Sequence, residues 1–340
     1  MVQANDRVVV VTGGAGFIGS NLADTLLRRG ERVIIYDNLS RPGTEKNLRW
    51  LASRHPKLLE IEIGDIRERE RLERLVRRAH TVYHLAAQVA VTSSVVDPWQ
   101  DFWVNAEGTL NVLQAARRAP DPPAVLFTST NKVYGELANV PIVARETRYG
   151  FQDGREGVSE DQPLDFHSPY GCSKGAADQY VRDFARIYGL PTTVFRMSCV
   201  YGPRQFGNED QGWVTHFVIS ALSGCAITLY GDGRQVRDIL YIDDLIEAMI
   251  RSAEASRRAP GRIYNIGGGV RNAVSLLELL DFLEGEVDRP IERRHAPWRP
   301  GDQRIYVSDI RKVGRELDWE PRVSKEEGLR RLIDWIRENA

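Results

Sequence analysis

Short apolar runs alternate with amphipathic segments through the N-terminal part of the chain. The runs predict buried strands near residues 7–12, 32–36, 58–63, 81–85, 123–128 and 192–196. Apolar residues at helical spacing predict helices between them, with long helices near residues 94–118 and 169–188. Strands that alternate with helices in this way predict an α/β fold built on a doubly wound parallel sheet.

A glycine-rich turn joins the first predicted strand to the helix that follows. The segment RVVVVTGGAGFIG spans residues 7–19 and contains Gly13, Gly16 and Gly19. The first glycine permits a tight turn, the second lets the backbone approach a pyrophosphate, and the third lets the helix pack close to the strand. Amide groups at the helix N-terminus stabilise phosphate charge, so the turn predicts dinucleotide binding and a Rossmann-type sheet.

The second predicted strand indicates which dinucleotide is bound. It ends at Asp37, eighteen residues after Gly19. A carboxylate at this place hydrogen-bonds an adenosine ribose and repels a 2′-phosphate, which favours NAD over NADP. Arg41 leaves NADP open as an alternative, although it lies beyond the acid and is equally suited to covering the adenine.

Tyr170 and Lys174 are four residues apart on the helix predicted from about Pro169. This spacing places both side chains on one face of the helix. A tyrosine has a pKa of about 10 and is a poor base at neutral pH. A nearby ammonium and a positively charged nicotinamide would stabilise the phenolate and lower that pKa. We therefore interpret Tyr170 as the base that takes a proton from a substrate hydroxyl while hydride leaves the same carbon.

The segment FTSTNKVYG, residues 127–135, follows another predicted apolar strand. Its hydroxyl groups emerge at the carboxyl end of the sheet, where ligands bind in this architecture. Thr130 is the predicted partner of a substrate hydroxyl beside Tyr170. Thr128 and Ser129 also fit a turn that caps the strand.

Composition argues against several other classes of partner. Lysine and arginine number 46 against 47 acidic residues, and a net charge of −1 gives no support for binding nucleic acid or adhering to a charged membrane. No stretch resembles a signal peptide or a membrane helix. The three cysteines, Cys172, Cys199 and Cys225, lack metal-ligand spacing and make a poor disulfide framework. We therefore expect a cytoplasmic protein without a metal site.

These motifs, in this order, resemble the extended short-chain dehydrogenase/reductase family of nucleotide-sugar epimerases and dehydratases. Asp65-Ile66 after the third strand, LAAQ at residues 85–88 after the fourth, and Asn105 also match, so the resemblance spans nearly the whole chain. It implies that Asp65 and Ile66 lie by the adenine and that Lys174 orients the nicotinamide ribose. The NAD-binding residues that we expect are Gly13, Gly16, Phe17, Ile18, Gly19, Asp37, Asn38, Ser40, Arg41, Asp65, Ile66, Leu85, Ala86, Ala87, Gln88, Asn105, Thr128, Tyr170 and Lys174.

The two residues after Thr130 narrow the reaction. Family 4,6-dehydratases have Asp-Glu there as the acid and base that expel water, whereas this chain has Asn131 and Lys132. A dehydratase without its carboxylates lacks its proton-transfer pair, so we exclude that class. An epimerase needs no such pair, because the oxidised sugar turns over in the site and recovers its hydride on the other face. We expect NAD to be tightly bound and recycled.

Longer stretches resemble one branch of the family, the CDP-tyvelose (CDP-paratose) 2-epimerases. They are STNKVYG from residue 129, DFHSPYGCSKGAADQY from residue 165, RQF from residue 204, DQGWV from residue 210 and QVRD from residue 235. The resemblance implies oxidation at C2 of a CDP-linked 3,6-dideoxyhexose. The segment before residue 165 and the C-terminal region are less alike, which leaves the exact sugar open.

Basic residues in the second half of the chain are candidates for the substrate diphosphate. A guanidinium matches phosphate oxygens bidentately, which favours Arg237 and Arg299. Arg299 to Asp302 matches the family's R-x-G-D pattern, which implies that Asp302 reaches the nucleotide ribose. The other expected substrate contacts are Gln88, Thr130, Asn131, Lys132, Arg204, Gln205 and Gln211.

We predict an NAD-binding Rossmann domain over residues 1–196 and a smaller substrate-binding lobe over residues 197–340, where strands become short and irregular. Segments near residues 239–266 are candidates to return to the first domain. Residues 135–166 are polar, rich in glycine and acids and without periodicity. A connection of that length predicts a lid or binding loop.

Alternatives remain for the reaction and the assembly. The same motifs fit an epimerase at another carbon such as C4, one acting on CDP-glucose, a net dehydrogenase, or a non-catalytic NAD-binding regulator. Apolar faces near residues 94–118 and 169–188 fit either the protein core or helix pairing in a homodimer or homotetramer. The residues of these faces are Val95, Val96, Trp99, Trp103, Leu110, Ala177, Tyr180, Val181 and Phe184.

Overall fold

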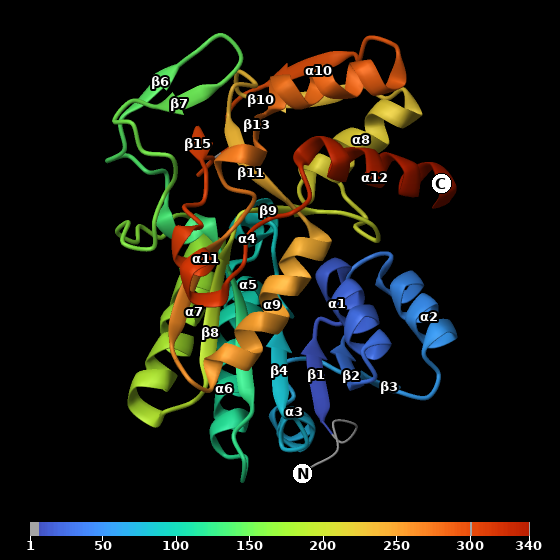
Figure 1. Ribbon diagram of the computed structural model, residues 1–340, viewed down its shortest axis with the longest axis vertical. Helices are drawn as coiled ribbons and strands as arrows, with labels where there is room; N and C mark the ends of the chain where they lie inside the picture. The colour runs from blue at the N-terminus through green and yellow to red at the C-terminus, as the bar shows by residue number, and fades with distance from the viewer. Residues whose placement is uncertain (1–6, 300, 340) are drawn as a thin grey trace.

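A parallel sheet lies at the centre of the protein, whose computed structural model describes residues 7–299 and 301–339 (Figure 1). The spatial order of its seven strands is β12 (Arg262–Ile266), β8 (Thr192–Met197), β5 (Ala124–Thr130), β4 (Thr81–His84), β1 (Val8–Thr12), β2 (Arg32–Asp37) and β3 (Leu59–Ile63). Every neighbouring pair is parallel. The predicted doubly wound sheet is confirmed, and each predicted strand is present within two residues of its expected bounds.

Helices cover both faces of this sheet because alternate side chains of each strand point in opposite directions. Val9 and Val11 of β1 belong to one buried cluster, whereas Val10 belongs to the other. The first cluster is covered by α1 (Phe17–Arg28), α2 (Thr44–Arg54), α9 (Ile242–Ser256) and α11 (Arg311–Leu317). The second is covered by α3 (Arg69–Val76), α6 (Gly108–Arg117) and α7 (Ser168–Tyr188).

The segment near residues 94–118 is not the single long helix that we predicted. It divides into α4 (Val91–Val96), α5 (Pro98–Phe102), the π-helix η2 (Trp103–Glu107) and α6. Pro98 has no N–H to donate and cannot continue α4. The Asp97 side chain then accepts a hydrogen bond of 3.0 Å from the backbone N–H of Gln100 and begins a new helix. Helical periodicity survives these breaks, which is why the pattern alone did not reveal them.

A second lobe lies beyond the carboxyl ends of the main strands (Figure 1). In its four-stranded sheet, β11 (Val236–Tyr241) pairs with β9 (Cys199–Tyr201), β13 (Ala273–Ser275) and β15 (Ile305–Tyr306). A separate two-stranded sheet consists of β10 (Ile227–Tyr230) and β14 (Arg293–Ala296). Its helices are α8 (Trp213–Ser223), α10 (Leu276–Val287) and α12 (Lys325–Asn339), with a 3-10 turn η4 (Val270–Asn272). None of the helices in the described ranges is both long enough and apolar enough to cross a membrane.

Residues 135–166 are more ordered than the irregular segment that we expected. They contain a hairpin of β6 (Ile142–Ala144) and β7 (Tyr149–Phe151), preceded by the 3-10 turn η3 (Asn131–Tyr134). The hairpin is attached to the second lobe, since the Tyr149 N–H donates to the Arg234 carbonyl at 2.9 Å and Arg148 pairs with Glu278 at 2.6 Å. The pattern did not reveal the two strands of this hairpin, because three-residue strands are too short to show periodicity. Its action as a lid stays a prediction.

A buried ion pair attaches α7 to the main sheet. The Arg196 guanidinium on β8 donates from Nε and Nη2 to the two oxygens of Asp178 on α7, each at 2.9 Å. Arg196 Nη1 also donates to the Tyr134 hydroxyl at 3.1 Å, and that hydroxyl donates to Asn265 on β12. The Asp178 side chain is 0% exposed and that of Arg196 is 3% exposed. Water hardly reaches either charge, so each charge is stabilised mainly by the other.

Asp178→Asn should destabilise the protein by about 3–5 kcal/mol, because it leaves the Arg196 charge buried without a counter-charge. Glu292→Gln, which breaks an exposed pair with Arg294, should change stability by about 0–1 kcal/mol. Equilibrium urea unfolding of both variants measures the difference. Equal, small effects would contradict the importance of the buried pair.

Candidate active site

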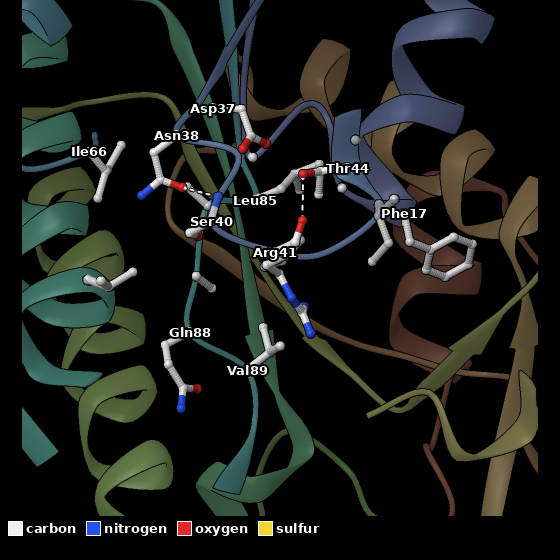
Figure 2. A pocket seen from close by; sticks show the side chains of 18 of the residues that line it. Phe17, Asp37, Asn38, Ser40, Arg41, Thr44, Ile66, Leu85, Gln88 and Val89 are labelled. Carbon is white, nitrogen blue, oxygen red and sulfur yellow. Dashed lines mark hydrogen bonds between the residues drawn. The ribbon is translucent and has the colours of Figure 1, made fainter. Parts of the chain in front are cut away.

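A pocket opens at the carboxyl edge of the main sheet, where the turns after β1, β2, β3 and β4 meet the end of β5 (Figure 2). It brings together eighteen of the residues that we expected to bind NAD: Gly13, Gly16, Phe17, Ile18, Gly19, Asp37, Asn38, Ser40, Arg41, Asp65, Ile66, Leu85, Ala86, Ala87, Gln88, Thr128, Tyr170 and Lys174. Sequence reasoning missed other lining residues, namely Tyr36, Thr44, Gly64, Val89, Ala90, Ser93, Gln100, Val104, Ser129 and Met197. Five of these ten adjoin expected residues along the chain, and the other five carry no motif signal of their own.

The glycine-rich turn leaves room for backbone and none for side chains. Gly13 has φ of +69°, and a Cβ there would lie 2.6 Å from the Ala86 backbone nitrogen. A Cβ on Gly19 would lie 2.6 Å from the Gly14 Cα. Helix α1 begins after Gly16, and no side chain caps it. Its first N–H groups therefore face the pocket as phosphate donors, which fits a dinucleotide.

Asp37 is fixed at the edge of this turn. Its Oδ2 accepts a hydrogen bond from the Ala15 N–H at 3.0 Å, and its Oδ1 accepts one from the Leu39 N–H at 2.8 Å. Burial raises the pKa of Asp37, while these backbone bonds oppose the rise. Figure 2 shows the Arg41 side chain pointing into the pocket. Its charge favours ionisation of Asp37, so the carboxylate is held in place and available to a ribose.

Asp65 lines the same pocket at the end of β3. Hydrogen bonds from the Arg67 side chain hold the pKa of Asp65 at about 2. Its Oδ2 also accepts a bond of 2.9 Å from Asn38 Nδ2, which connects the turns after β2 and β3. Ile66 lies beside it in the pocket lining and provides an apolar surface suited to a flat base.

Tyr170 and Lys174 of α7 both line the pocket. Tyr170 is 8% exposed and Lys174 is 3% exposed. Burial raises the pKa of Tyr170 to about 12, although a hydrogen bond with the Thr130 side chain opposes the rise. Burial lowers the pKa of Lys174 to about 7. In the protein alone, burial outweighs the neighbouring groups that favour the phenolate, so the expected lowering of this pKa, which includes the charge of the nicotinamide, stays a prediction.

Asn105 is not part of the pocket lining, contrary to our expectation of a cofactor contact. It is 1% exposed and lies behind the turn after β4. Its Oδ1 accepts a bond from the Gln88 N–H, and its Nδ2 donates to the Gln88 carbonyl, both at 3.0 Å. A side chain satisfied in this way orders the turn instead of contacting a ligand.

His84 at the end of β4 is a buried connector that the sequence did not reveal. Its two ring nitrogens contact the hydroxyls of Thr12 at 2.8 Å and Thr109 at 2.9 Å. Burial lowers the pKa of His84 to about 3, so the ring is neutral. Since the Thr12 hydroxyl also accepts from the Ala86 N–H, His84 connects the first and fourth strands beneath the pocket.

Four of the expected substrate residues form a cluster next to Thr130. Asp302 Oδ1 accepts from Arg237 Nη2 at 2.7 Å and from Lys132 Nζ at 3.3 Å. Asn131 Nδ2 donates to Gln303 at 3.3 Å. Burial would raise the pKa of Asp302, but the charges of Arg237 and Lys132 outweigh it and lower that pKa. The cluster joins the end of β5 to the loop that follows β14, and Pro300 of this loop lies outside the described residues.

The remaining expected substrate residues are dispersed. Gln211 lines the pocket, and its Oε1 is buried without a hydrogen-bond partner among the described residues. Arg299 stacks on Tyr230, with 3.8 Å between the guanidinium carbon and the ring centroid. Arg204 stacks in the same way on Trp50 at 3.3 Å, and the Gln205 side chain bonds Thr215 and the Val200 carbonyl. Neither Arg204 nor Gln205 lines the pocket. The Arg204 guanidinium packs against α2, and the Gln205 amide is hydrogen-bonded within the second lobe.

Comparisons with known proteins agree with this geometry. Residues 9–267 match the model of the NAD dependent epimerase/dehydratase family. A CDP-paratose 2-epimerase of Salmonella typhi is 43% identical over 334 residues, which cover 96% of this chain and 98% of that protein.

Solved structures of nucleotide-sugar enzymes superpose on the whole chain. A UDP-glucose 4-epimerase of Thermus thermophilus in complex with NAD is 35% identical, with a TM-score of 0.82 and coverage of 98% of this chain and 100% of that one. A UDP-glucose 4-epimerase of Thermotoga maritima with UDP-glucose is 32% identical, with a TM-score of 0.83 and coverage of 98% and 99%. Together with the pocket, these matches show that the chain belongs to the NAD dependent epimerase/dehydratase family.

Proposed function

We propose that this protein is a nucleotide-sugar 2-epimerase that interconverts CDP-paratose and CDP-tyvelose and keeps its NAD throughout. The observation that carries the proposal is that Tyr170 and Lys174, four residues apart on α7, both line the pocket, with Thr130 at the end of β5 close enough to influence the Tyr170 hydroxyl. The residues after Thr130 are Asn131 and Lys132, so no carboxylate pair stands there to expel water. The 43% identity to a CDP-paratose 2-epimerase supports the choice of C2 and of a CDP-linked sugar.

Each residue of the site has a separate role in the proposed reaction. Tyr170 accepts the proton of the C2 hydroxyl, and Thr130 orients that hydroxyl. Lys174 bonds the nicotinamide ribose and stabilises the phenolate with its ammonium. Bound NAD supplies the hydride acceptor and, after oxidation of the sugar, the hydride donor. After the keto-sugar has turned, Tyr170 returns its proton to the C2 oxygen, so neither cofactor nor water is consumed.

The Asp302 cluster is suited to holding the nucleotide while the sugar turns. Arg237 and Lys132 place two positive charges beside Thr130, and Arg299 adds a third farther out. A diphosphate can pair with these groups through charge-assisted hydrogen bonds. An anchored diphosphate with a mobile sugar is what inversion by rotation requires.

Proton NMR of CDP-paratose with the purified protein, without added NAD, tests the function. We expect the C2 proton to change from a gluco to a manno coupling pattern at a catalytic amount of protein. If the spectrum does not change, and a control with added NAD does not change either, CDP-paratose is rejected as the substrate. Parallel incubations with CDP-glucose and UDP-glucose would then identify a different sugar or inversion at C4.

Tyr170→Phe should abolish most turnover, by about 10²–10⁴-fold, because it removes the proton acceptor while keeping the ring. NAD should remain bound, as measured by absorbance and by cofactor release on denaturation. Phe282→Tyr, at a partly buried aromatic position on α10 outside the pocket lining, serves as a control for a single hydroxyl change. Near-normal turnover in Tyr170→Phe would refute the assignment of the base.

Asp37→Ala should weaken NAD binding about tenfold or relax the discrimination against NADP, because the ribose loses a carboxylate partner and a 2′-phosphate loses its repulsion. Titration of the cofactor-stripped protein with NAD and NADP measures both affinities. If both affinities stay unchanged, Asp37 is not the ribose ligand.

The assembly is a further part of the proposal. Five of the apolar side chains expected at an interface are exposed on α4, α5, η2 and α7, with Val96 at 85%, Trp99 at 66%, Val95 at 58%, Tyr180 at 46% and Trp103 at 40%. Ala177, Val181 and Phe184 of α7 belong instead to the core. An exposed apolar face of this extent is typical of an interface, and its partner in our proposal is the same face of a second copy.

Trp99→Asp should convert this homodimer, or a homotetramer built from it, to smaller species, because a charge in the centre of an apolar interface is costly to bury. Light scattering after gel filtration measures the mass. Val270→Asp, at an apolar position 52% exposed on η4, should leave the mass unchanged. A monomeric wild-type protein would contradict the proposed pairing.

A further inference from the structure

A buried carboxylate lies beside Tyr170 and Lys174 and has no part in the proposed chemistry. Asp101 of α5 is 0% exposed. Its Oδ2 accepts a short hydrogen bond from Ser173 Oγ, and its Oδ1 accepts from Asn105 Nδ2 at 3.2 Å. Ser173 stands on α7 between Tyr170 and Lys174 in sequence, so Asp101 packs against the helix at the reactive pair. No arginine, lysine or histidine of the described residues forms an ion pair with it within 4.0 Å.

The other charged groups around Lys174 are already neutralised. Asp178, one turn farther along α7, pairs through both oxygens with Arg196. His84 of β4 faces Lys174 as a neutral ring. Asp101 and Asp178 both favour the Lys174 ammonium, and Asp101 is the one of the two without an ion-pair partner among the described residues. Burial raises the pKa of Asp101, while the Ser173 hydrogen bond and the Lys174 charge oppose the rise and favour its carboxylate.

Tyr170 is exposed to two opposing charges. Asp101 disfavours its phenolate, and Arg41 across the pocket favours it. The Tyr170 backbone N–H donates to Ser94 Oγ of α4 at 3.1 Å. The segment that contains α4 and α5 therefore holds the start of α7 and sets its electrostatics at the same time.

We propose that Asp101 is a positioning residue for the reaction: its buried negative charge keeps Lys174 in the ammonium form and sets the pH range in which Tyr170 can exchange protons. The inference rests on the proposed function, because it assigns the protonation states that function requires. Asp101 belongs to none of the sequence motifs from which the site was predicted.

The direction of the effect follows from elementary electrostatics. A negative charge stabilises the protonated form of every neighbouring group, whether that form is an ammonium or a neutral phenol. Asp101 accordingly raises the pKa of both Lys174 and Tyr170. At Lys174 this effect opposes burial, which lowers the pKa. At Tyr170 it adds to burial, which raises the pKa. Removing the charge should lower both pKa values and move the whole pH profile of turnover to lower pH.

Asp101→Asn removes the charge and can keep the hydrogen bonds. The new amide oxygen accepts from Asn105, and the new amide nitrogen donates to Ser173 Oγ. Ser173 then donates to the Tyr170 carbonyl, which lies 3.2 Å away. A change in this variant therefore reports the charge and not the loss of a contact.

Two readouts are compared between wild type, Asp101→Asn and Asp101→Thr, each with its NAD. The first is the pH dependence of kcat. The second is NMR of protein labelled with ¹³C at the lysine ε-carbon, which follows the Lys174 ammonium directly and is assigned with Lys174→Arg. Asp183→Asn, the same chemical change at an exposed position on α7, is the matched control. We expect both limbs of the profile and the Lys174 midpoint to move to lower pH by about one unit in the Asp101 variants.

The outcomes separate this inference from the function it rests on. A lower kcat with unshifted limbs and an unshifted Lys174 midpoint would overturn the charge role and leave Asp101 a structural residue. Failure of both Asp101 variants to fold with NAD would overturn it in the same way. If wild type turns over no nucleotide sugar, the proposed function fails, while the Lys174 midpoint still decides whether Asp101 acts on it.

Discussion

Burial of a phenol and an amine on one face of α7 is the constraint on which the site depends. Desolvation disfavours both the phenolate of Tyr170 and the ammonium of Lys174, which are the forms that the proposed chemistry uses. The protein can restore them only with charges placed nearby. Helix α7 must therefore be held rigidly against the sheet, and the Asp178–Arg196 pair provides that attachment without leaving a net charge at its end of the helix.

The pocket and the second lobe are built in different ways around this helix. Backbone contacts too close for any Cβ shape the phosphate end, so the cofactor position is set by glycine and not by flexible side chains. Next to Thr130, long cationic side chains are instead fixed by one carboxylate, Asp302. If this cluster anchors the diphosphate as proposed, the sugar is the part that moves. That division is what inversion through a keto intermediate requires.

The sequence predicted what depends on local spacing. Periodicity predicted the strands, and short motifs predicted the glycine turn, Asp37 and the Tyr170–Lys174 pair. The pocket is lined by the residues of these motifs. Long-range partners left no such signal: Ser173 contacts Asp101 across 72 residues, and His84 joins two hydroxyls from different elements. Arg204 and Gln205 matched a motif, yet their side chains point elsewhere, since a motif does not specify a rotamer. Burial, which raises the pKa of Tyr170, likewise left no signal in the sequence pattern.

Hydride transfer at C2 is tested most directly with CDP-paratose that carries deuterium at C2, incubated with the protein in ordinary water. If the cofactor takes the hydride from C2 and returns it to the same carbon, the CDP-tyvelose formed should retain the deuterium at C2, as measured by mass spectrometry and NMR. Loss of the label to solvent would mean that C2 is inverted by proton exchange. That result would contradict the role assigned to NAD and to Tyr170.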